Sequence, residues 1–312
     1  MINVYIDGSA GTTGLRIHER LANRSDVTVT ALPDALRKDP AARKQALNSC
    51  DVAFLCLPDD AAIEAVSMIE NPDVTVIDAS TAHRTKSDWA YGFPELSAAH
   101  LEKLKNSKRI AVPGCHASGF CAIVYPLTAS GLMPADYPLV CHSLTGYSGG
   151  GKKMIADYEN PDRSVLLDAP RAYGLSQKHK HLPEMQAVCG LAQPPVFTPI
   201  VSDFYSGMEV TVGLHTALLN GVTLQQVHEL YQKHYENQSF VRVLPLGADA
   251  EGGFLAANAL SGKDYMEITV CGNDERILVS ARFDNLGKGA SGAAVECMNI
   301  ACGLDAATGL VL

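Results

Sequence analysis

The chain has 312 residues, of which 47% are apolar and 19% are charged, and its formal net charge is −9 at pH 7. This length exceeds that of one usual domain, so two domains are expected, and the apolar fraction can fill two cores. The negative net charge argues against nucleic acid or an anionic membrane surface as the main partner. An anionic ligand must therefore be met by local positive charge.

The cysteines predict a reduced, cytoplasmic protein without a metal site. They are odd in number and scattered, and no C-x-x-C pair occurs, so neither a zinc site nor a disulfide framework is expected. The chain opens on a strand pattern, MINVYIDG, with no pattern of a secretion signal before it, and no apolar run approaches the roughly 18 residues of a membrane span. The nine cysteines are Cys50, Cys56, Cys115, Cys121, Cys141, Cys189, Cys271, Cys297 and Cys302.

The first 79 residues alternate between strand and helix patterns, which is typical of a doubly wound α/β domain. Residues 51–57 (DVAFLCL) form a continuous apolar run, as in a strand that is buried on both faces of a parallel sheet. The helix predicted after the first strand places Leu15 and Leu21 on its apolar side.

A glycine turn joins the first strand to this helix. Its spacing is G-x-x-G-x-x-G (Gly8, Gly11, Gly14), with Thr12 and Thr13 between the last two glycines. Glycines between a strand and a helix allow the backbone to approach a pyrophosphate, which the helix N-terminus then holds. The turn therefore predicts nucleotide binding.

The residues after the second predicted strand, at 27–31, leave the choice between NAD and NADP open. Asp34 lies about twenty residues beyond the glycine turn, where an acceptor for a ribose 2′-hydroxyl is expected. Arg37 and Lys38 lie close by and suit a 2′-phosphate instead.

The carboxyl end of the predicted strand at 74–77 carries further candidate ligands. In doubly wound sheets ligands bind beyond the carboxyl ends of the strands, so Asp78, Ser80 and Arg84 are expected to face a cleft. Arg84 has the fork geometry that holds a phosphate or a carboxylate. The polar segment from Thr81 to Lys108 is predicted to leave the sheet.

Cys115 lies at a second turn from strand to helix, in RIAVPGCHASGFCAIVYP (residues 109–126). The N-terminus of a helix favours negative charge, and the thiolate is the nucleophilic form of cysteine. The same N–H groups can hold an oxyanion that forms when the sulfur attacks a carbonyl. We therefore expect Cys115 to be a nucleophile.

Two later segments carry charged and titratable groups. A glycine-rich loop, Gly146–Gly151, is followed by Lys152 and Lys153 and suits an anionic group. The block HKHLPE contains His179 and His181, either of which can serve as a general acid/base, and Glu184, which can orient an imidazole. If this block is extended, the two imidazoles point to opposite sides.

From residue 196 onward strand patterns dominate, interrupted by one amphipathic helix at 223–236. This predicts a separate, mostly antiparallel substrate domain that can also supply a dimer interface. A glycine turn at 284–292 and an apolar helix at 293–303 predict that the chain then returns to the nucleotide domain.

Taken together, these residues resemble the N-acetyl-gamma-glutamyl-phosphate reductases, in their compact second type. The resemblance covers nearly the whole chain, and the Pro-Gly-Cys and His-x-His-x-Pro-Glu blocks, in this order and spacing, are its most specific parts. The other matching segments are residues 8–14, 76–84, 91–96, 149–153, 197–199 and 284–292.

The resemblance implies an α/β plus α+β fold. A Rossmann domain (1–115 and 286–312) binds NADP, and a strand-rich catalytic and dimerisation domain (116–285) follows the pattern of aspartate-semialdehyde and glyceraldehyde-phosphate dehydrogenases. It implies an oxidoreductase that uses NADPH to reduce a small acyl phosphate, N-acetyl-L-glutamyl 5-phosphate, to an aldehyde. A homodimer or homotetramer is expected, and neither nucleic acid nor a membrane is expected as a partner.

The resemblance also implies roles for individual residues. Cys115 is the nucleophile, and the His-x-His block supplies the acid/base, with His181 favoured over His179. The cofactor ligands are Gly8, Gly11, Thr12, Thr13, Gly14, Arg37, Ser80 and Asn285, with Asn285 beside the nicotinamide. The substrate ligands are Arg84, Lys152 and Glu184.

The chain departs from the family pattern on both sides of Pro-Gly-Cys. Val112 replaces an asparagine and His116 replaces an aromatic residue, which makes His116 a rival base. Two alternative functions remain at this stage: aspartate-semialdehyde dehydrogenase, and a non-catalytic NADP-binding redox sensor with Cys115 as the sensing thiol.

Overall fold

The computed structural model describes residues 1–247 and 252–312. The described residues form two compact units, 1–114 with 290–311, and 115–289 with 312.

The first unit is a doubly wound α/β structure. Its sheet, in the described residues, has six parallel strands in the order β2-β1-β3-β4-β6-β5. The strands are β1 (Ile2–Asp7), β2 (Val27–Thr30), β3 (Val52–Leu55), β4 (Thr75–Asp78), β5 (Ala90–Tyr91) and β6 (Arg109–Ala111). The helices are α1 (Thr12–Leu21), α2 (Pro40–Ser49), α3 (Asp59–Ser67), α4 (Ala98–Lys105) and α9 (Gly292–Ala301).

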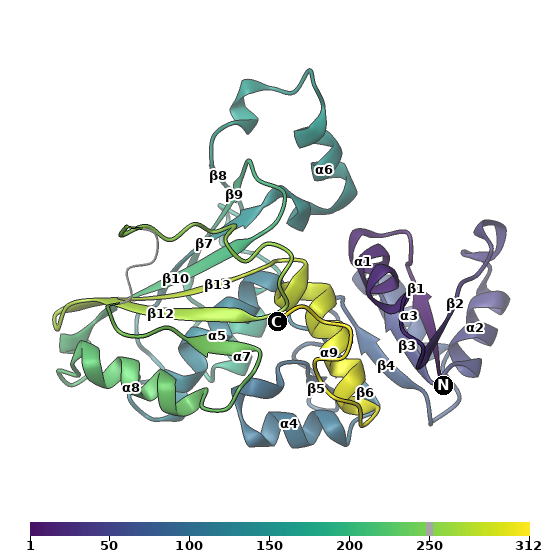
Figure 1. The fold of residues 1–312 in the computed structure, drawn as a ribbon, viewed down its shortest axis with the longest axis horizontal. Coiled ribbons are helices and arrows are strands. Elements are labelled where there is room, and N and C mark those ends of the chain that lie inside the picture. Colours follow the sequence, from purple (N-terminus) through teal and green to yellow (C-terminus); the bar gives the residue numbers. More distant parts are fainter. Residues whose placement is uncertain (248–251) are drawn as a thin grey trace. The chain divides into compact units, whose positions relative to one another are not determined.

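Alternation along the strands builds one core on each face of this sheet. Val4 of β1 and Phe54 of β3 are buried in the core that includes residues of α1 and α9, which contact one another (Figure 1). Tyr5 and Leu55, their neighbours in sequence, are buried in the opposite core with residues of α2 and α3. Because successive strand residues face opposite sides, a continuous apolar run fills both cores.

Two expectations for this unit are wrong. Leu15 is 45% exposed, whereas the buried residues of α1 are Gly14, Ile17 and Leu21, because only positions at a spacing of three or four share one face of a helix. The segment 81–108 does not leave the sheet entirely, since it contains β5, which pairs with β6 at the edge. This strand has two residues, which is too short to produce a recognisable apolar alternation.

The second unit is an α+β structure around a mixed sheet. In the residues described, its strand order is β11-β12-β13-β10-β7-β9-β8, antiparallel except for the pairs β11–β12 and β7–β9. The strands are β7 (Val140–Gly146), β8 (Arg171–Ala172), β9 (Val196–Ser202), β10 (Met208–His215), β11 (Val241–Val243), β12 (Met266–Gly272) and β13 (Arg276–Phe283). The helices are α5 (Cys115–Ala129), α6 (Gly151–Glu159), α7 (Leu182–Val188) and α8 (Leu224–His234).

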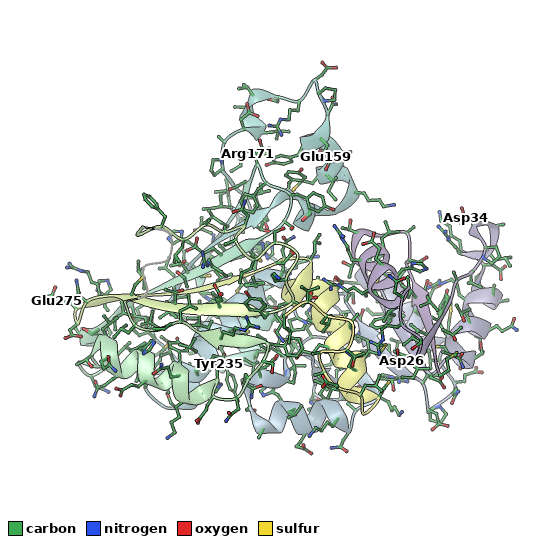
Figure 2. The ribbon with its side chains drawn as sticks, viewed as in Figure 1. Asp26, Asp34, Glu159, Arg171, Tyr235 and Glu275 are labelled. Carbon is green, nitrogen blue, oxygen red and sulfur yellow. The ribbon has the colours of Figure 1, made fainter. Side chains whose placement is uncertain are left out.

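Helix α5 forms the core of this unit. It packs on β10 and β13, and α7 and α8 lie beside it (Figure 1). The packing requires a glycine at 119, because a Cβ there would lie 2.4 Å from Cγ2 of Val210. Pro126 lacks the N–H that would bond the carbonyl of Ala122, and the hydroxyl of Tyr235 donates to that carbonyl instead, at 2.7 Å (Figure 2). The carbonyl group that loses its helical partner at Pro126 thus has another hydrogen-bond donor in the core.

Candidate active site

The glycine turn of the first unit leaves no room for a side chain at positions 8 and 14. Gly8 has φ +84°, and a Cβ there would lie 2.2 Å from the carbonyl oxygen of Cys56. A Cβ on Gly14 would lie 2.5 Å from the carbonyl oxygen of Gly8. Gly11, whose N–H donates to the Gly8 carbonyl at 2.9 Å, precedes Thr12 at the start of α1. A side chain at position 8 or 14 would therefore overlap the main chain around the start of this helix, whose N-terminal N–H groups are a favourable place for an anion.

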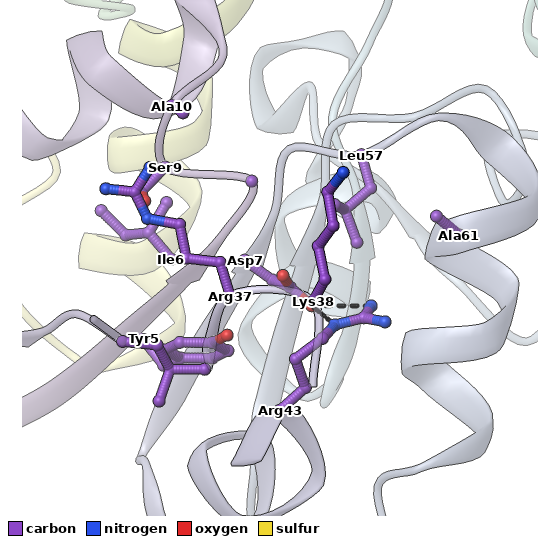
Figure 3. A pocket seen from close by; sticks show the side chains of 12 residues that line it. Tyr5, Ile6, Asp7, Ser9, Ala10, Arg37, Lys38, Arg43, Leu57 and Ala61 are labelled. Atoms are coloured by element: carbon purple, nitrogen blue, oxygen red, sulfur yellow. Dashed lines mark hydrogen bonds and ion pairs between the residues drawn. The ribbon is translucent and has the colours of Figure 1, made fainter. Parts of the chain in front are cut away.

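A pocket of about 320 Å³ adjoins this turn (Figure 3). It combines glycine-turn residues with apolar side chains and with three cationic ones, Arg37, Lys38 and Arg43. The residues that line it are Tyr5, Ile6, Asp7, Gly8, Ser9, Ala10, Leu32, Arg37, Lys38, Arg43, Leu57 and Ala61. Its mixture of apolar walls and cationic groups suits a nucleotide.

The cations of this pocket differ in their pairing. Arg43 is buried and donates to Asp7 from Nε at 3.1 Å and from Nη2 at 3.0 Å, and its Nη1 donates to Glu64 at 3.0 Å. Burial raises the pKa of Asp7 and is opposed by the hydrogen bonds from Arg43. The Arg43 charge is thus offset inside the protein, whereas Arg37 and Lys38 are exposed, and Arg37 pairs with an exposed carboxylate.

Asp34, the residue expected to accept a ribose hydroxyl, lies at the periphery of this unit (Figure 2). Its carboxylate is 87% exposed and pairs with Nη2 of Arg37 at 2.5 Å. Asp34 is not among the described residues that line the pocket, and Asp7 supplies the carboxylate found among them.

Ser80 and Arg84 lie beyond the carboxyl end of β4, and both are buried. Asp78 accepts hydrogen bonds from the N–H of Ser80 at 2.9 Å, from its hydroxyl at 2.7 Å, and from Nδ1 of His83 at 2.6 Å. Arg84 donates from Nε to the carbonyl of Val112 at 2.9 Å and from Nη2 to that of Ala79 at 3.0 Å. The roles of Ser80 towards the cofactor and of Arg84 towards the substrate stay predictions.

Cys115 is the first residue of α5 in the second unit. The main chain of Gly289 comes close to it, since a Cβ on Gly289 would lie 3.1 Å from Cβ of Cys115. The sulfur is therefore placed at the N-terminus of a buried helix, where main-chain N–H groups favour an anion.

Three histidines gather in this unit around His116, the residue that follows Cys115 in the sequence. The ring centroids of His116 and His179 are 5.5 Å apart, those of His116 and His181 are 5.6 Å apart, and those of His179 and His181 are 4.7 Å apart. The segment is not extended, since it turns into α7 at His181, so the condition under which His179 and His181 would point to opposite sides is not met. The N–H of His181 donates to Nδ1 of His179 at 3.2 Å.

His116 is a buried, neutral imidazole. Its Nδ1 is 2.6 Å from the hydroxyl of Ser143, and its Nε2 is 2.6 Å from the hydroxyl of Tyr173. Burial, and then the charge of His179, lower the pKa of His116 to about 3. Burial, and then the charge of Lys180, lower the pKa of His179 to about 4. Both rings are therefore uncharged at neutral pH.

The other predicted residues of this unit occupy separate places. Asn285 is buried, accepts from the N–H of Gly207 at 2.9 Å and donates to the hydroxyl of Ser148 at 3.0 Å, so it holds the glycine-rich loop. Glu184 is buried in the first turn of α7, one turn after His181. Lys152 is exposed at the start of α6.

Sequence reasoning missed Tyr173 and Ser143. Tyr173 directly follows β8, and Ser143 lies inside β7. The signal available was the exchange of an aromatic residue for His116, since a buried imidazole requires a hydrogen-bond partner on each nitrogen.

In the described part of the chain, no cluster of three histidine, cysteine or acidic side chains could hold a metal ion. In the same part of the chain, no helix has the length and apolarity needed to cross a membrane.

Comparisons with known proteins define the class. Residues 115–285 match the family model for the semialdehyde dehydrogenase dimerisation domain, and residues 34–104 match that for the semialdehyde dehydrogenase NAD binding domain. Aspartate semialdehyde dehydrogenase from Francisella tularensis has the same fold, with a TM-score of 0.72, 15% identity, and 96% of this chain and 99% of that chain covered. The fold is thus that of a two-domain dehydrogenase with a nicotinamide cofactor site.

More similar sequences narrow the family. N-acetyl-gamma-glutamyl-phosphate reductase from Burkholderia cenocepacia is 45% identical over 307 residues, which cover 97% of this chain and 98% of that protein. N-acetyl-gamma-glutamyl-phosphate reductase 2 from Pseudomonas putida is 45% identical over 303 residues, which cover 96% of each. The chain belongs to the N-acetyl-gamma-glutamyl-phosphate reductase family of the semialdehyde dehydrogenases.

Proposed function

We propose that this protein catalyses the NADPH-dependent reduction of N-acetyl-L-glutamyl 5-phosphate to N-acetyl-L-glutamate 5-semialdehyde, with release of phosphate, as a step of arginine biosynthesis. The observation that carries the proposal is Cys115 at the N-terminus of α5, followed directly by His116, whose ring lies in a cluster with those of His179 and His181. The names of relatives about 45% identical over nearly the whole chain supply the substrate.

The first half of the reaction forms a thioester. The Cys115 thiolate attacks the acyl carbon, and the main-chain N–H groups at the start of α5 stabilise the oxyanion. The carbon–oxygen bond to phosphate then breaks, and phosphate departs with the electron pair of that bond. A thiol suits this step because it is nucleophilic at neutral pH and because a thioester is a better electrophile than an oxygen ester.

The second half reduces the thioester. A nicotinamide cofactor held by the glycine turn would supply the hydride that reduces the acyl carbon. An imidazolium donates a proton to the resulting thiohemiacetal oxygen, and the imidazole takes that proton back as the carbon–sulfur bond breaks, which releases the aldehyde and the Cys115 thiolate.

We assign the proton transfer to His181 rather than to His179. The low pKa of His179 leaves its ring neutral at pH 7, and its Nδ1 accepts a hydrogen bond from the main chain. A neutral imidazole is a weak acid, so His179 is better suited to donate a hydrogen bond from Nε2 to the substrate. Glu184, one turn along α7, is the group that would orient His181.

We propose NADP rather than NAD as the cofactor. The glycine turn leads into the N-terminus of α1, where main-chain N–H groups can hold a pyrophosphate. Arg37 and Lys38 line the adjoining pocket and would pair with a 2′-phosphate, whereas Asp34 is not among the described lining residues.

We further propose a homodimer or a homotetramer that acts in the cytoplasm on a small-molecule substrate. The match of residues 115–285 to a dimerisation domain supports the assembly. Nine free cysteines support a reducing compartment.

Steady-state kinetics test the proposal. NADPH formation is followed with N-acetylglutamate semialdehyde, with and without phosphate, for the wild type and for Cys115→Ala. We expect phosphate-dependent activity that the variant lacks while NADP binding is retained. A preference for aspartate semialdehyde would point to the shorter substrate, and NADP binding without turnover of either aldehyde would point to a redox sensor.

A further inference from the structure

The guanidinium of Arg43 forms a fixed, flat part of the pocket beside the glycine turn. Figure 3 shows Arg43 in the wall of this pocket, with its bonds to Asp7 as dashed lines. All three guanidinium nitrogens donate to carboxylates, Nε and Nη2 to Oδ2 of Asp7 at 3.1 and 3.0 Å, and Nη1 to Oε2 of Glu64 at 3.0 Å. The N–H groups of arginine point outward in one plane, so these bonds fix the plane and occupy much of its edge. A ligand in the pocket then meets Arg43 at a face of the guanidinium.

The charges around Arg43 favour a neutral group at this point of the pocket. Two carboxylates, those of Asp7 and Glu64, face one guanidinium, so the cluster has no excess positive charge. Lys38 lines the same pocket, is exposed, and makes no ion pair in the described part of the chain. A phosphate is therefore attracted to Lys38 more strongly than to Arg43.

Apolar side chains line the pocket together with Arg43. Leu57 precedes α3, Ala61 lies in the first turn of that helix, and both are half-buried. Leu32, which follows β2, is also half-buried and packs with Leu57 against the core on this face of the sheet. A flat, neutral ring suits such a place, because apolar groups contact it and a guanidinium is attracted to the face of an aromatic ring.

We propose that the adenine ring of the cofactor stacks on the guanidinium of Arg43, and that Asp7 and Glu64 are positioning residues which fix the plane of that guanidinium. The inference rests on the proposed binding of NADP beside the glycine turn. One ribose carries both the adenine and the 2′-phosphate, so a phosphate near Lys38 keeps the adenine within the same pocket. Arg43 thus binds the part that NADP and NAD share, whereas Arg37 and Lys38 bind the phosphate that distinguishes them.

The test is equilibrium titration of the full protein with NADPH, with NADH, and with 2′,5′-ADP, which has the adenine and the 2′-phosphate but no nicotinamide. Arg43→Lys keeps a cation between the two carboxylates but has no planar face. We expect the Kd of all three ligands to rise by the same factor, about tenfold, so that the preference for NADPH over NADH is unchanged. Arg24→Lys is the matched control and should bind all three ligands as the wild type does. Arg24 is also an arginine of the first unit, is 5% exposed at its side chain, and donates to Asp26 and Asn299.

Wild-type affinity for NADPH in folded Arg43→Lys would overturn the proposal. A loss confined to NADPH and 2′,5′-ADP would also overturn it, because Arg43 would then contact the 2′-phosphate, and so would unchanged binding of 2′,5′-ADP. Circular dichroism checks the fold of each variant. If Arg43→Lys does not fold, Asp7→Asn combined with Arg43→Met removes that charge pair together and should show the same equal loss.

The wild type separates this inference from the proposed function. A wild type that binds neither dinucleotide contradicts the proposed cofactor. A wild type that binds NADPH, with an Arg43→Lys variant of equal affinity, contradicts only the role of Arg43.

Discussion

Substitution of His116 by phenylalanine should make the protein less sensitive to acid. The folded protein holds this imidazole neutral, with a pKa of about 3, whereas an unfolded chain has the ordinary value of about 6.5. Between these two values the unfolded chain binds a proton that the folded protein does not. The stability that neutral His116 contributes is therefore complete above pH 6.5 and is lost progressively as the pH falls towards 3.

The size of this effect follows from the two pKa values. At pH 5 the unfolded state gains about 2 kcal/mol from protonation of this one group, and below pH 6 the slope approaches about 1.4 kcal/mol per pH unit. His116→Phe removes that slope, although it also lowers stability at neutral pH by removing the hydrogen bonds to Ser143 and Tyr173. His179 has the same sign of shift and remains in the variant, so some acid sensitivity persists.

Urea unfolding at pH 7 and at pH 5, followed by fluorescence and circular dichroism, measures the effect. The free energy of unfolding should fall between the two pH values by about 2 kcal/mol less in His116→Phe than in the wild type. His142→Gln, an exposed histidine next to Ser143 in β7, is the control and should keep the full wild-type loss. An equal loss in His116→Phe and in the wild type would refute the neutral, buried assignment.

Three further substitutions test other parts of the structure. Removal of both cations in Arg37→Ala/Lys38→Ala should raise the KM for NADPH by about 10- to 100-fold and leave the KM for NADH nearly unchanged, because only NADPH carries the 2′-phosphate; equal effects on both would refute the assignment. Gly14→Ala should weaken NADP binding at least about tenfold in equilibrium titrations, since its Cβ would lie 2.5 Å from a main-chain oxygen, and wild-type affinity would contradict the close approach. Tyr235→Phe should lower the free energy of urea unfolding by about 1–3 kcal/mol, because the carbonyl of Ala122 loses its donor opposite Pro126; wild-type stability would show that the carbonyl is satisfied otherwise.

The arrangement of the first unit was largely predictable from its sequence. Residues 51–57 are apolar throughout because β3 contributes side chains to both cores, and this pattern is visible without a structure. The glycines of the first turn were equally clear, because no other residue fits at positions 8 and 14. The prediction that Leu15 lies on the buried face of α1 was wrong, because in a short helix the sequence does not distinguish a single exposed leucine from a buried one.

The candidate site was predictable only in part. The sequence singles out Cys115 because it lies at a turn from strand to helix, and the histidine block because two imidazoles, which titrate near neutral pH, lie two residues apart. It does not reveal that His179, His181 and His116 share one cluster, because this depends on the turn into α7. Tyr173 was overlooked for the same reason, since its partner is 57 positions away in the sequence.

Direct observation of the thioester would test the central claim that Cys115 carries the acyl group. The protein is mixed with N-acetylglutamyl phosphate in the absence of NADPH, digested, and analysed by mass spectrometry. We predict an N-acetylglutamyl adduct on the peptide that contains Cys115, which disappears when NADPH is added and is absent in Cys115→Ala. Turnover without such an adduct, or an adduct confined to a different cysteine, would contradict the account.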